Sequence, residues 1–230
     1  MMKGAGPNSK QALVAGFEPY GGFGRNPAAE IALALDGASI AGHKVIGRVL
    51  PVAYRGIAER LETLVDDVQP SLVIVLGLAP GESLIRLERF GLNIADFEIA
   101  DNEGLRLDDA LIAANGATAL RASLPLRAIA RALLENGIPV CLSSTAGSYL
   151  CNAALYHLMR ILENRSPPSL GGFIHLPYIP EQVASMLADG HGNPRLALHQ
   201  RADLASMDLP LQIKAISIAI AATVAAAKQS

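Results

Sequence analysis

The feature that most constrains the fold is a short, wholly apolar run, LVIVL, at residues 72–76. Such a run is typical of a strand buried on both faces in the centre of a parallel sheet. Further apolar runs at 11–15, 44–52, 140–143 and 173–174 alternate with helical patterns at 27–35, 54–68, 126–136, 152–162, 180–188 and 209–228. This alternation predicts a single open, mostly parallel twisted sheet with helices on both faces, an α/β/α sandwich.

The chain shows no internal linker, so residues 11–230 are predicted to form one domain after a disordered lead-in at 1–10. Hydrophobic residues make up 51% of the chain and aromatic residues only 4%, so Ala, Leu, Ile and Val must build the core. The pattern changes at 84–100, which predicts one or two strands in an antiparallel excursion. Residues 101–122 are polar and are predicted to be mostly loop.

Composition also limits the partners and the compartment. The net charge is −2 and no run of Lys or Arg occurs, so we expect no nucleic acid partner. Two cysteines are too few for a disulfide scaffold and no segment resembles a signal peptide, so we expect a cytoplasmic protein. The Ala-rich segment 211–227 carries Lys214 and is predicted to pack on the sheet or at a subunit contact, not to cross a membrane.

Three side chains at the ends or edges of predicted elements point to nucleophilic chemistry. Cys151 lies where a loop turns into a helix, and the positive end of the helix dipole favours a thiolate there. The free N–H groups of the same turn can receive an oxyanion. His175 ends a predicted strand, and Glu88 lies in the apolar run 84–94. Because ligands collect beyond the carboxyl ends of the strands in such sheets, these residues can meet in one cleft.

Each of these residues also has a plainer interpretation. Cys151 can be an inert buried cysteine, His175 a structural histidine, and Glu88 a solvated acid beside Arg89. The Gly-rich stretch 16–24 suggests a phosphate loop, but it lacks both the G-x-G-x-x-G pattern and the P-loop Lys-Ser/Thr pair. The other histidines show no metal-ligand spacing, so no metal is expected.

Taken together, four blocks of sequence resemble the pyroglutamyl-peptidase I (pyrrolidone-carboxyl peptidase) family of cysteine peptidases. The blocks are GFEPYGG at 16–22 with Asn26-Pro27, LER at 87–89, DNEG at 101–104, and AGSYLCN at 146–152 with GFIHLPYIPEQ at 172–182. The resemblance implies an α/β/α fold assembled as a homodimer or homotetramer. It also implies hydrolysis, without metal or cofactor, of the amide that follows an N-terminal pyroglutamyl residue of small peptides.

The resemblance further implies the roles of individual residues. Cys151 is the nucleophile that forms a thioester, His175 the base and acid, and Glu88 the carboxylate that orients the histidine, with Asp101 as the rival for this third role. Phe17 and Tyr20 flank the lactam ring and Asn26 holds their loop. Apolar surface and backbone contacts to the lactam come from Val52, Leu78 and Leu150.

The chain departs from the family pattern beside the cleft. The usual Gly-Gln-Ala-Gly-Gly-Arg-like segment is GLAPGE here, so Leu78 replaces a glutamine and Glu82 a basic residue. Glu98 stands where bacterial relatives often carry a base. These changes keep two alternatives open, namely a cysteine hydrolase of another small amide or lactam, and a non-enzymatic protein that retains the fold.

Overall fold

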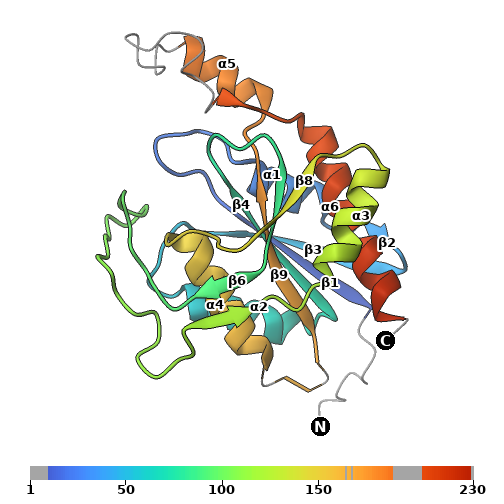
Figure 1. The fold of residues 1–230 in the computed structure, drawn as a ribbon, viewed down its shortest axis with the longest axis horizontal. Helices are drawn as coiled ribbons and strands as arrows, with labels where there is room; N and C mark the ends of the chain where they lie inside the picture. The colour runs from blue at the N-terminus through green and yellow to red at the C-terminus, as the bar shows by residue number, and fades with distance from the viewer. Residues whose placement is uncertain (1–9, 164, 167, 189–203, 229–230) are drawn as a thin grey trace.

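The computed structural model describes residues 10–163, 165–166, 168–188 and 204–228 (Figure 1). Apart from Lys10, the predicted lead-in lies outside the described residues. A seven-stranded sheet has the order β2-β3-β1-β4-β9-β5-β8, and β6 and β7 form a separate two-stranded ribbon. The strands are β1 (Gln11–Phe17), β2 (Ser39–Ile40), β3 (His43–Leu50), β4 (Leu72–Leu78), β5 (Ile85–Glu88), β6 (Phe90–Leu92), β7 (Ala119–Arg121), β8 (Val140–Ser143) and β9 (Leu170–Leu176). The helices are α1 (Pro27–Leu35), α2 (Ile57–Val68), α3 (Leu126–Glu135), α4 (Leu150–Glu163), α5 (Pro180–Ala188) and α6 (Leu209–Ala227).

Strand β4 occupies the central position that its apolar sequence predicts. All of its residues are buried, and it pairs in parallel with β1 on one side and with β9 on the other. Because β1 also pairs in parallel with β3, four neighbouring strands share one direction. The predicted open, mostly parallel sheet is therefore confirmed, and its register places Gly77 of β4 beside His175 of β9.

Strands β5 and β8 run opposite to β9. The antiparallel excursion predicted within 84–100 is therefore confirmed as β5, which lies between β9 and β8. The expectation that every site residue follows the carboxyl end of a strand at one edge is wrong for Cys151. Strand β8 points away from the edge where β9 ends, and the loop 144–149 brings the chain back to that edge before α4 begins.

Two predicted boundaries differ from the structure for local reasons. The helix predicted at 54–68 begins at Ile57, because Gly56 before it adopts a left-handed backbone with φ of 80°. The strand predicted at 44–52 ends at Leu50, and Pro51, which has no N–H for a sheet ladder, follows it. The short strands β2 and β7 lie in segments for which no strand was predicted.

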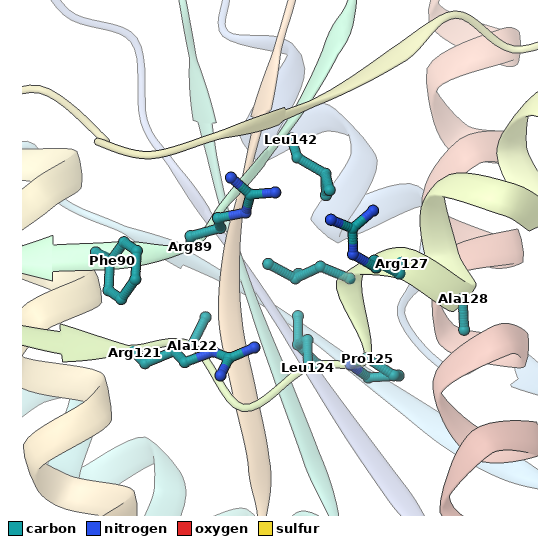
Figure 2. Close-up of a pocket in the computed structure, with 10 residues that line it drawn as sticks. Arg89, Phe90, Arg121, Ala122, Leu124, Pro125, Arg127, Ala128 and Leu142 are labelled. Carbon is teal, nitrogen blue, oxygen red and sulfur yellow. The ribbon is translucent and has the colours of Figure 1, made fainter.

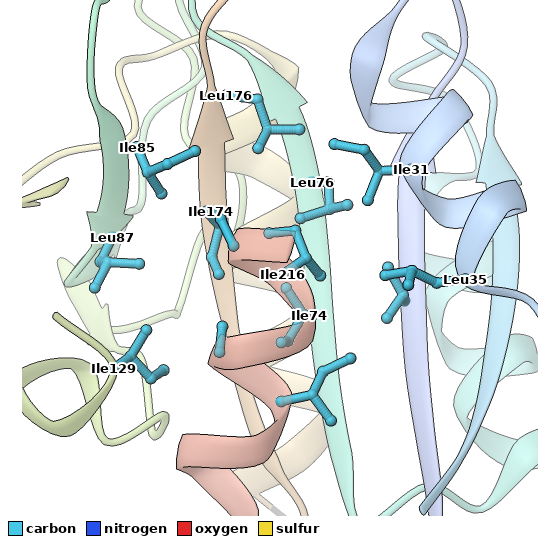
Figure 3. Packing of buried hydrophobic residues seen from close by; sticks show 14 of the residues in the cluster. Ile31, Leu35, Ile74, Leu76, Ile85, Leu87, Ile129, Ile174, Leu176 and Ile216 are labelled. Atoms are coloured by element: carbon cyan, nitrogen blue, oxygen red, sulfur yellow. The ribbon is translucent and has the colours of Figure 1, made fainter. Parts of the chain in front are cut away.

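Two apolar clusters, one on each face of the sheet, form the core. Helices α1, α3 and α6 cover one face, where Ile31 lies near Leu76 of β4, Ile216 near Ile74 and Ile174, and Ile129 near Leu87 of β5 (Figure 3). Helices α2 and α4 cover the other face, through side chains such as Leu61 and Leu158. The sheet between two helical layers confirms the predicted α/β/α sandwich.

Helix α6 is the one helix in the described part of the chain that is long and apolar enough to cross a membrane. Ala215, Ile216, Ala219 and Ile220 on one of its faces are fully buried in the core cluster. The helix also packs against α1 and α3. This burial agrees with the expectation that the segment packs on the sheet, and it is typical of a core helix in a globular domain.

Candidate active site

Two buried side chains from neighbouring antiparallel strands meet at the centre of the site. His175 is next to last in β9, and Glu88 ends β5, which pairs with β9 at this level. The Nδ1 atom of His175 lies 2.8 Å from Oε1 of Glu88. Glu88 is fully buried and His175 is 7% exposed. A carboxylate on Nδ1 fixes the tautomer of the imidazole and leaves Nε2 for another partner.

Cys151 lies over the sheet because Gly77 leaves room for it. Cys151 is the second residue of α4, so its backbone N–H belongs to the positive end of the helix. A Cβ atom on Gly77 would lie 2.9 Å from Sγ of Cys151 and 2.7 Å from Cζ of Phe173. Since Gly77 is paired with His175 across β4 and β9, this close approach brings the thiol to the histidine.

The electrostatics of His175 reflect that neighbourhood. Burial lowers the pKa of His175, but the negative charge and hydrogen bond of Cys151 and the hydrogen bond and charge of Glu88 together raise it to about 9. An imidazole with this environment is held as the imidazolium near neutral pH when its cysteine partner is a thiolate. The three side chains can therefore form an ion pair that a carboxylate orients.

Arg86 places a positive charge beside Glu88. Its Nε atom lies 3.3 Å from Oε1 of Glu88, and the same guanidinium forms an ion pair with Glu82. It also donates to Oγ of Ser143 at 2.7 Å. The Oε2 atom of Glu88 is buried and has no hydrogen-bond partner among the described residues, so the nearby guanidinium compensates the buried charge.

Asn152 and Ser148 hold the start of α4 in place. The buried Asn152 side chain accepts a hydrogen bond from the N–H of Leu92 at 2.7 Å and donates to the carbonyls of Leu92 and Ile94. Ser148 donates through Oγ to the carbonyl of Asp96 at 2.8 Å. The loop that carries Cys151 is thus fastened to the segment after β6.

An apolar wall adjoins the thiol. Phe17, Val52 and Leu150 are buried in one cluster, against which Tyr20 and Cys151 pack. The ring of Tyr149 extends this wall, with its centroid 6.0 Å from Tyr20 and 4.7 Å from Phe97. Burial, and then the neighbouring Cys151, raises the pKa of Tyr20. Leu78 ends β4 and is also buried.

The loops that carry these apolar residues are bound to one another by polar side chains. Asn26 donates to the carbonyl of Glu18 at 2.8 Å and caps α1 by accepting from the N–H of Ala28. The carboxylate of Glu18 in turn accepts from the N–H of Val52 and from the side chain of Asn102. Three separate loops therefore share one rigid frame.

Asp101 belongs to this frame, and its hydrogen bonds are with backbone N–H groups and not with His175. Its Oδ2 accepts from the N–H of Tyr54 at 2.8 Å, and its Oδ1 accepts from the N–H groups of Glu103 and Leu105. Both carboxylate oxygens are thus occupied by backbone donors. Glu88 is the carboxylate that the structure places against the histidine.

Several residues of the site were missed by the sequence argument. Gly77, Arg86, Asn152 and Tyr149 lie in or beside the quoted blocks, but their roles depend on strand pairing and loop contacts that no local pattern reveals. Glu82, singled out as an acid in place of a base, turns out to be paired with Arg86. In the described part of the chain, no group of three or more His, Cys, Asp or Glu side chains is arranged to hold a metal ion.

Comparisons with known proteins identify the family of this chain. The family model described as pyroglutamyl peptidase matches residues 10–226. The pyrrolidone-carboxylate peptidase of Pyrococcus furiosus is 39% identical over 210 residues, which cover 91% of this chain and 96% of that protein. A pyrrolidone-carboxylate peptidase of Yersinia pseudotuberculosis is 37% identical, with 89% and 92% covered.

Solved structures show the same likeness. The pyrrolidone carboxyl peptidase from Thermococcus litoralis superposes with a TM-score of 0.86 at 37% identity, and the match covers 95% of each chain. The family match spans nearly the whole described chain, including Cys151, His175 and Glu88. The chain therefore belongs to the pyroglutamyl peptidase family.

Proposed function

We propose that this protein removes an N-terminal pyroglutamyl residue from small peptides, with Cys151 as nucleophile, His175 as base and acid, and Glu88 as the orienting carboxylate. The observation that carries the proposal is the contact of 2.8 Å between Glu88 and His175 on a histidine that also interacts with Cys151. Covalent hydrolysis needs a nucleophile, a base and an orienting group that contact one another in this order.

The reaction proceeds in two steps, the formation of a thioester on Cys151 and its hydrolysis. The Cys151 thiolate attacks the carbonyl carbon that follows the lactam ring, and the resulting oxyanion is received by the backbone N–H of Cys151 at the start of α4. The C–N bond breaks as the His175 imidazolium gives its proton to the leaving amine, which leaves a thioester. Water then attacks the thioester while His175 takes its proton, and pyroglutamate and the thiolate are released.

Arg86 acts in this scheme as a positioning residue. Its guanidinium lies 3.3 Å from Glu88 and is itself held by Glu82 and Ser143. By compensating the charge of the buried carboxylate, it holds Glu88 oriented toward His175. Glu82 therefore contributes to the site through Arg86, and its negative charge is not free to bind a substrate.

Substrate selection follows from the walls beside the thiol. The lactam ring is small, flat and uncharged, and Phe17, Tyr20, Val52 and Leu150 offer it a matching apolar surface. An ordinary N-terminal glutamate would bring an ammonium and a carboxylate into this surface without partners, at a cost of several kcal/mol. The site is therefore selective for the cyclised residue.

The assembly and the compartment are part of the same proposal. Ile213 and Ile218 on α6 remain only half-buried in the single chain, which supports a homodimer or homotetramer with α6 at a contact. Both Cys141 and Cys151 are free thiols, which supports a reducing cytoplasmic location. Light scattering after size-exclusion chromatography tests the assembly, and a monomeric mass at micromolar concentration would contradict it.

The experiment that tests the function compares three aminomethylcoumarin amides, those of pyroglutamate, proline and glutamine, at equal concentration. We expect the pyroglutamyl amide to be hydrolysed at least about a hundredfold faster in kcat/KM, because the other two carry a charged amine. Preference for the prolyl or glutaminyl amide would instead support a hydrolase of another amide.

A second measurement separates that outcome from a protein without activity. Iodoacetamide at pH 6 should alkylate Cys151 faster than Cys141, because Cys151 lies at a helix start in contact with His175, whereas burial raises the pKa of the Cys141 thiol. Equal, slow alkylation of both cysteines together with no turnover would overturn the enzymatic proposal.

A further inference from the structure

A cavity lies between the β6-β7 ribbon and the start of α3 (Figure 2). Its volume is about 520 Å³, and none of its lining residues takes part in the chemistry proposed for Cys151. Three of those residues are arginines, Arg89, Arg121 and Arg127. The remaining walls are mostly apolar and come from Phe90, Ala122, Leu124, Pro125, Leu126, Ala128 and Leu142.

The three arginines have no counter-charge in this cavity. No Asp or Glu is among the lining residues. Within the described chain, no ion pair or side-chain hydrogen bond involves Arg89, Arg121 or Arg127. The protein as a whole carries a net charge of −2, so the cluster is not a consequence of a basic surface.

The backbone holds the three arginines around one space. The N–H of Arg89 donates to the carbonyl of Ser143 at 2.9 Å, and the N–H of Ala122 donates to the carbonyl of Arg89 at 2.8 Å. Arg121 is the last residue of β7, and Arg127 is the second residue of α3. In Figure 2 the side chains of Arg89, Arg121 and Arg127 lie on different sides of the group of lining residues. Arg89 is half-buried and Arg121 and Arg127 are exposed, and three like charges that line one cavity favour an anion among them.

The start of α3 adds a further donor. The N–H groups of Leu126, Ala128 and Ile129 bond to the carbonyls of Leu124 and Pro125. In the described part of the chain the N–H of Arg127 has no such partner. It belongs to the positive end of the helix dipole and lies on the residue that lines the cavity, so it supports the binding of an anion there.

The cavity is separate from the cleft even though Glu88 and Arg89 are consecutive. Glu88 contacts His175 on the face of the sheet that α4 covers. Arg89 instead lines the cavity with Leu124, Leu126 and Leu142, which pack with the core cluster on the α3 face. A ligand in the cavity would therefore lie behind the sheet from the thiol.

We propose that this cavity binds a small organic phosphate, a dianion with an apolar substituent. Guanidinium groups match the oxygens of a phosphate with paired, charge-assisted hydrogen bonds. A dianion neutralises most of the charge of three arginines, and Phe90 with the leucine walls accommodates a ring or short chain. This site is independent of the proposed peptidase reaction.

Titration calorimetry at constant ionic strength tests the proposal, with phenyl phosphate and inorganic phosphate as the probes. We expect saturable binding of one phenyl phosphate per chain, with inorganic phosphate several times weaker because it lacks the ring. Arg121→Gln and Arg127→Gln should each weaken binding about tenfold, the effect of losing one charged hydrogen-bonding partner. Arg131→Gln, an exposed arginine on the same helix outside the cavity, is the matched control and should leave binding unchanged.

Three results would overturn the proposal. The first is no saturable binding of either phosphate to the wild-type protein. The second is equal weakening by Arg131→Gln and Arg127→Gln, which would mean attraction to surface charge alone. The third is a change of oligomeric state in Arg121→Gln or Arg127→Gln with no response to phosphate, which would assign the arginines to a contact between subunits. Hydrolysis of the pyroglutamyl amide by each variant shows that the fold is intact.

Discussion

The site at Cys151 and the cavity at Arg127 differ in how their charged side chains are paired. In the cleft, Glu88 and His175 are buried and in contact, and Arg86 lies against Glu88. In the cavity, three arginines surround a partly apolar space without any acidic side chain in its lining. Paired buried charges are oriented in advance for a reaction on an uncharged substrate. Unpaired charges that line a cavity favour the binding of a ligand with the opposite charge.

The largest expected effect on turnover comes from replacing Cys151, with Cys141 as its control. Cys151→Ser should lower the hydrolysis of pyroglutamyl-aminomethylcoumarin by about 10⁴-fold or more, as loss of a nucleophile does in related mechanisms. Cys141→Ser is the matched control, since Cys141 lies in β8 and burial raises the pKa of its thiol. Comparable losses of turnover in both variants would contradict the assignment of Cys151 as the nucleophile.

The next largest difference in kcat should be between variants of the two buried acids, Glu88 and Asp101. Glu88→Gln should lower kcat by about 10²–10⁴-fold, because the histidine loses its orienting carboxylate. Asp101→Asn should lower kcat less than about tenfold and lower the melting temperature, because three backbone N–H groups lose charged acceptors. A larger loss of kcat in Asp101→Asn than in Glu88→Gln would contradict the assignment of the third role.

Arg86 should show a smaller effect that depends on Glu88. Arg86→Met should lower kcat about tenfold, or ~1.4 kcal/mol of transition-state stabilisation, because the buried carboxylate loses its compensating charge. The loss should nearly vanish when Arg86→Met is made in the Glu88→Gln protein, since no carboxylate then needs compensation. Additive losses in this double-mutant cycle would show that Arg86 acts elsewhere.

The cavity should have the smallest effect on turnover. Arg121→Gln and Arg127→Gln should leave kcat and KM for pyroglutamyl-aminomethylcoumarin within about twofold of the wild type, since surface substitutions away from a site change little. The measurement is a side-by-side kinetic assay at fixed ionic strength. A large change in kcat would show that the cavity and the cleft are coupled, and the contrast between them would fail.

Local sequence was enough to predict the elements and the chemical groups. The apolar run at 72–76 identified the central strand. The helix start at Cys151 and the strand end at His175 predicted a nucleophile and a base at the ends of elements. Helices α1 and α5 and strand β8 begin and end at the predicted residues. These features depend on neighbours in the chain, which is why a sequence can reveal them.

The contacts that assemble the site depend on pairing between distant segments. Gly77 makes room for Cys151 only because β4 pairs with β9 in one register. Glu88, with Arg86 beside it, contacts His175 only because β5 inserts antiparallel beside β9. Asp101 accepts a hydrogen bond from the N–H of Tyr54, which lies 47 residues away in the chain. None of these pairings has a local signature; only the family resemblance joined Glu88 to His175, and the contacts of Gly77, Arg86 and Asp101 were not predicted.

The most direct test of the coupled Cys151–His175–Glu88 unit is the titration of His175 by NMR. Burial lowers its pKa while Cys151 and Glu88 raise it to about 9, above its ordinary value of 6.5. The interaction therefore stabilises the fold fully below pH 6.5 and is lost as the pH rises through about 9, where turnover should also fall because the leaving amine loses its proton donor.

We expect a pKa near 9 in the wild-type protein and a clearly lower value in Cys151→Ser, which keeps Glu88 but removes the thiolate. Arg127→Gln, in the cavity behind the sheet, should leave the value unchanged. A His175 pKa that is the same in the wild type and in Cys151→Ser would contradict the account, because the histidine would then not sense the cysteine at all.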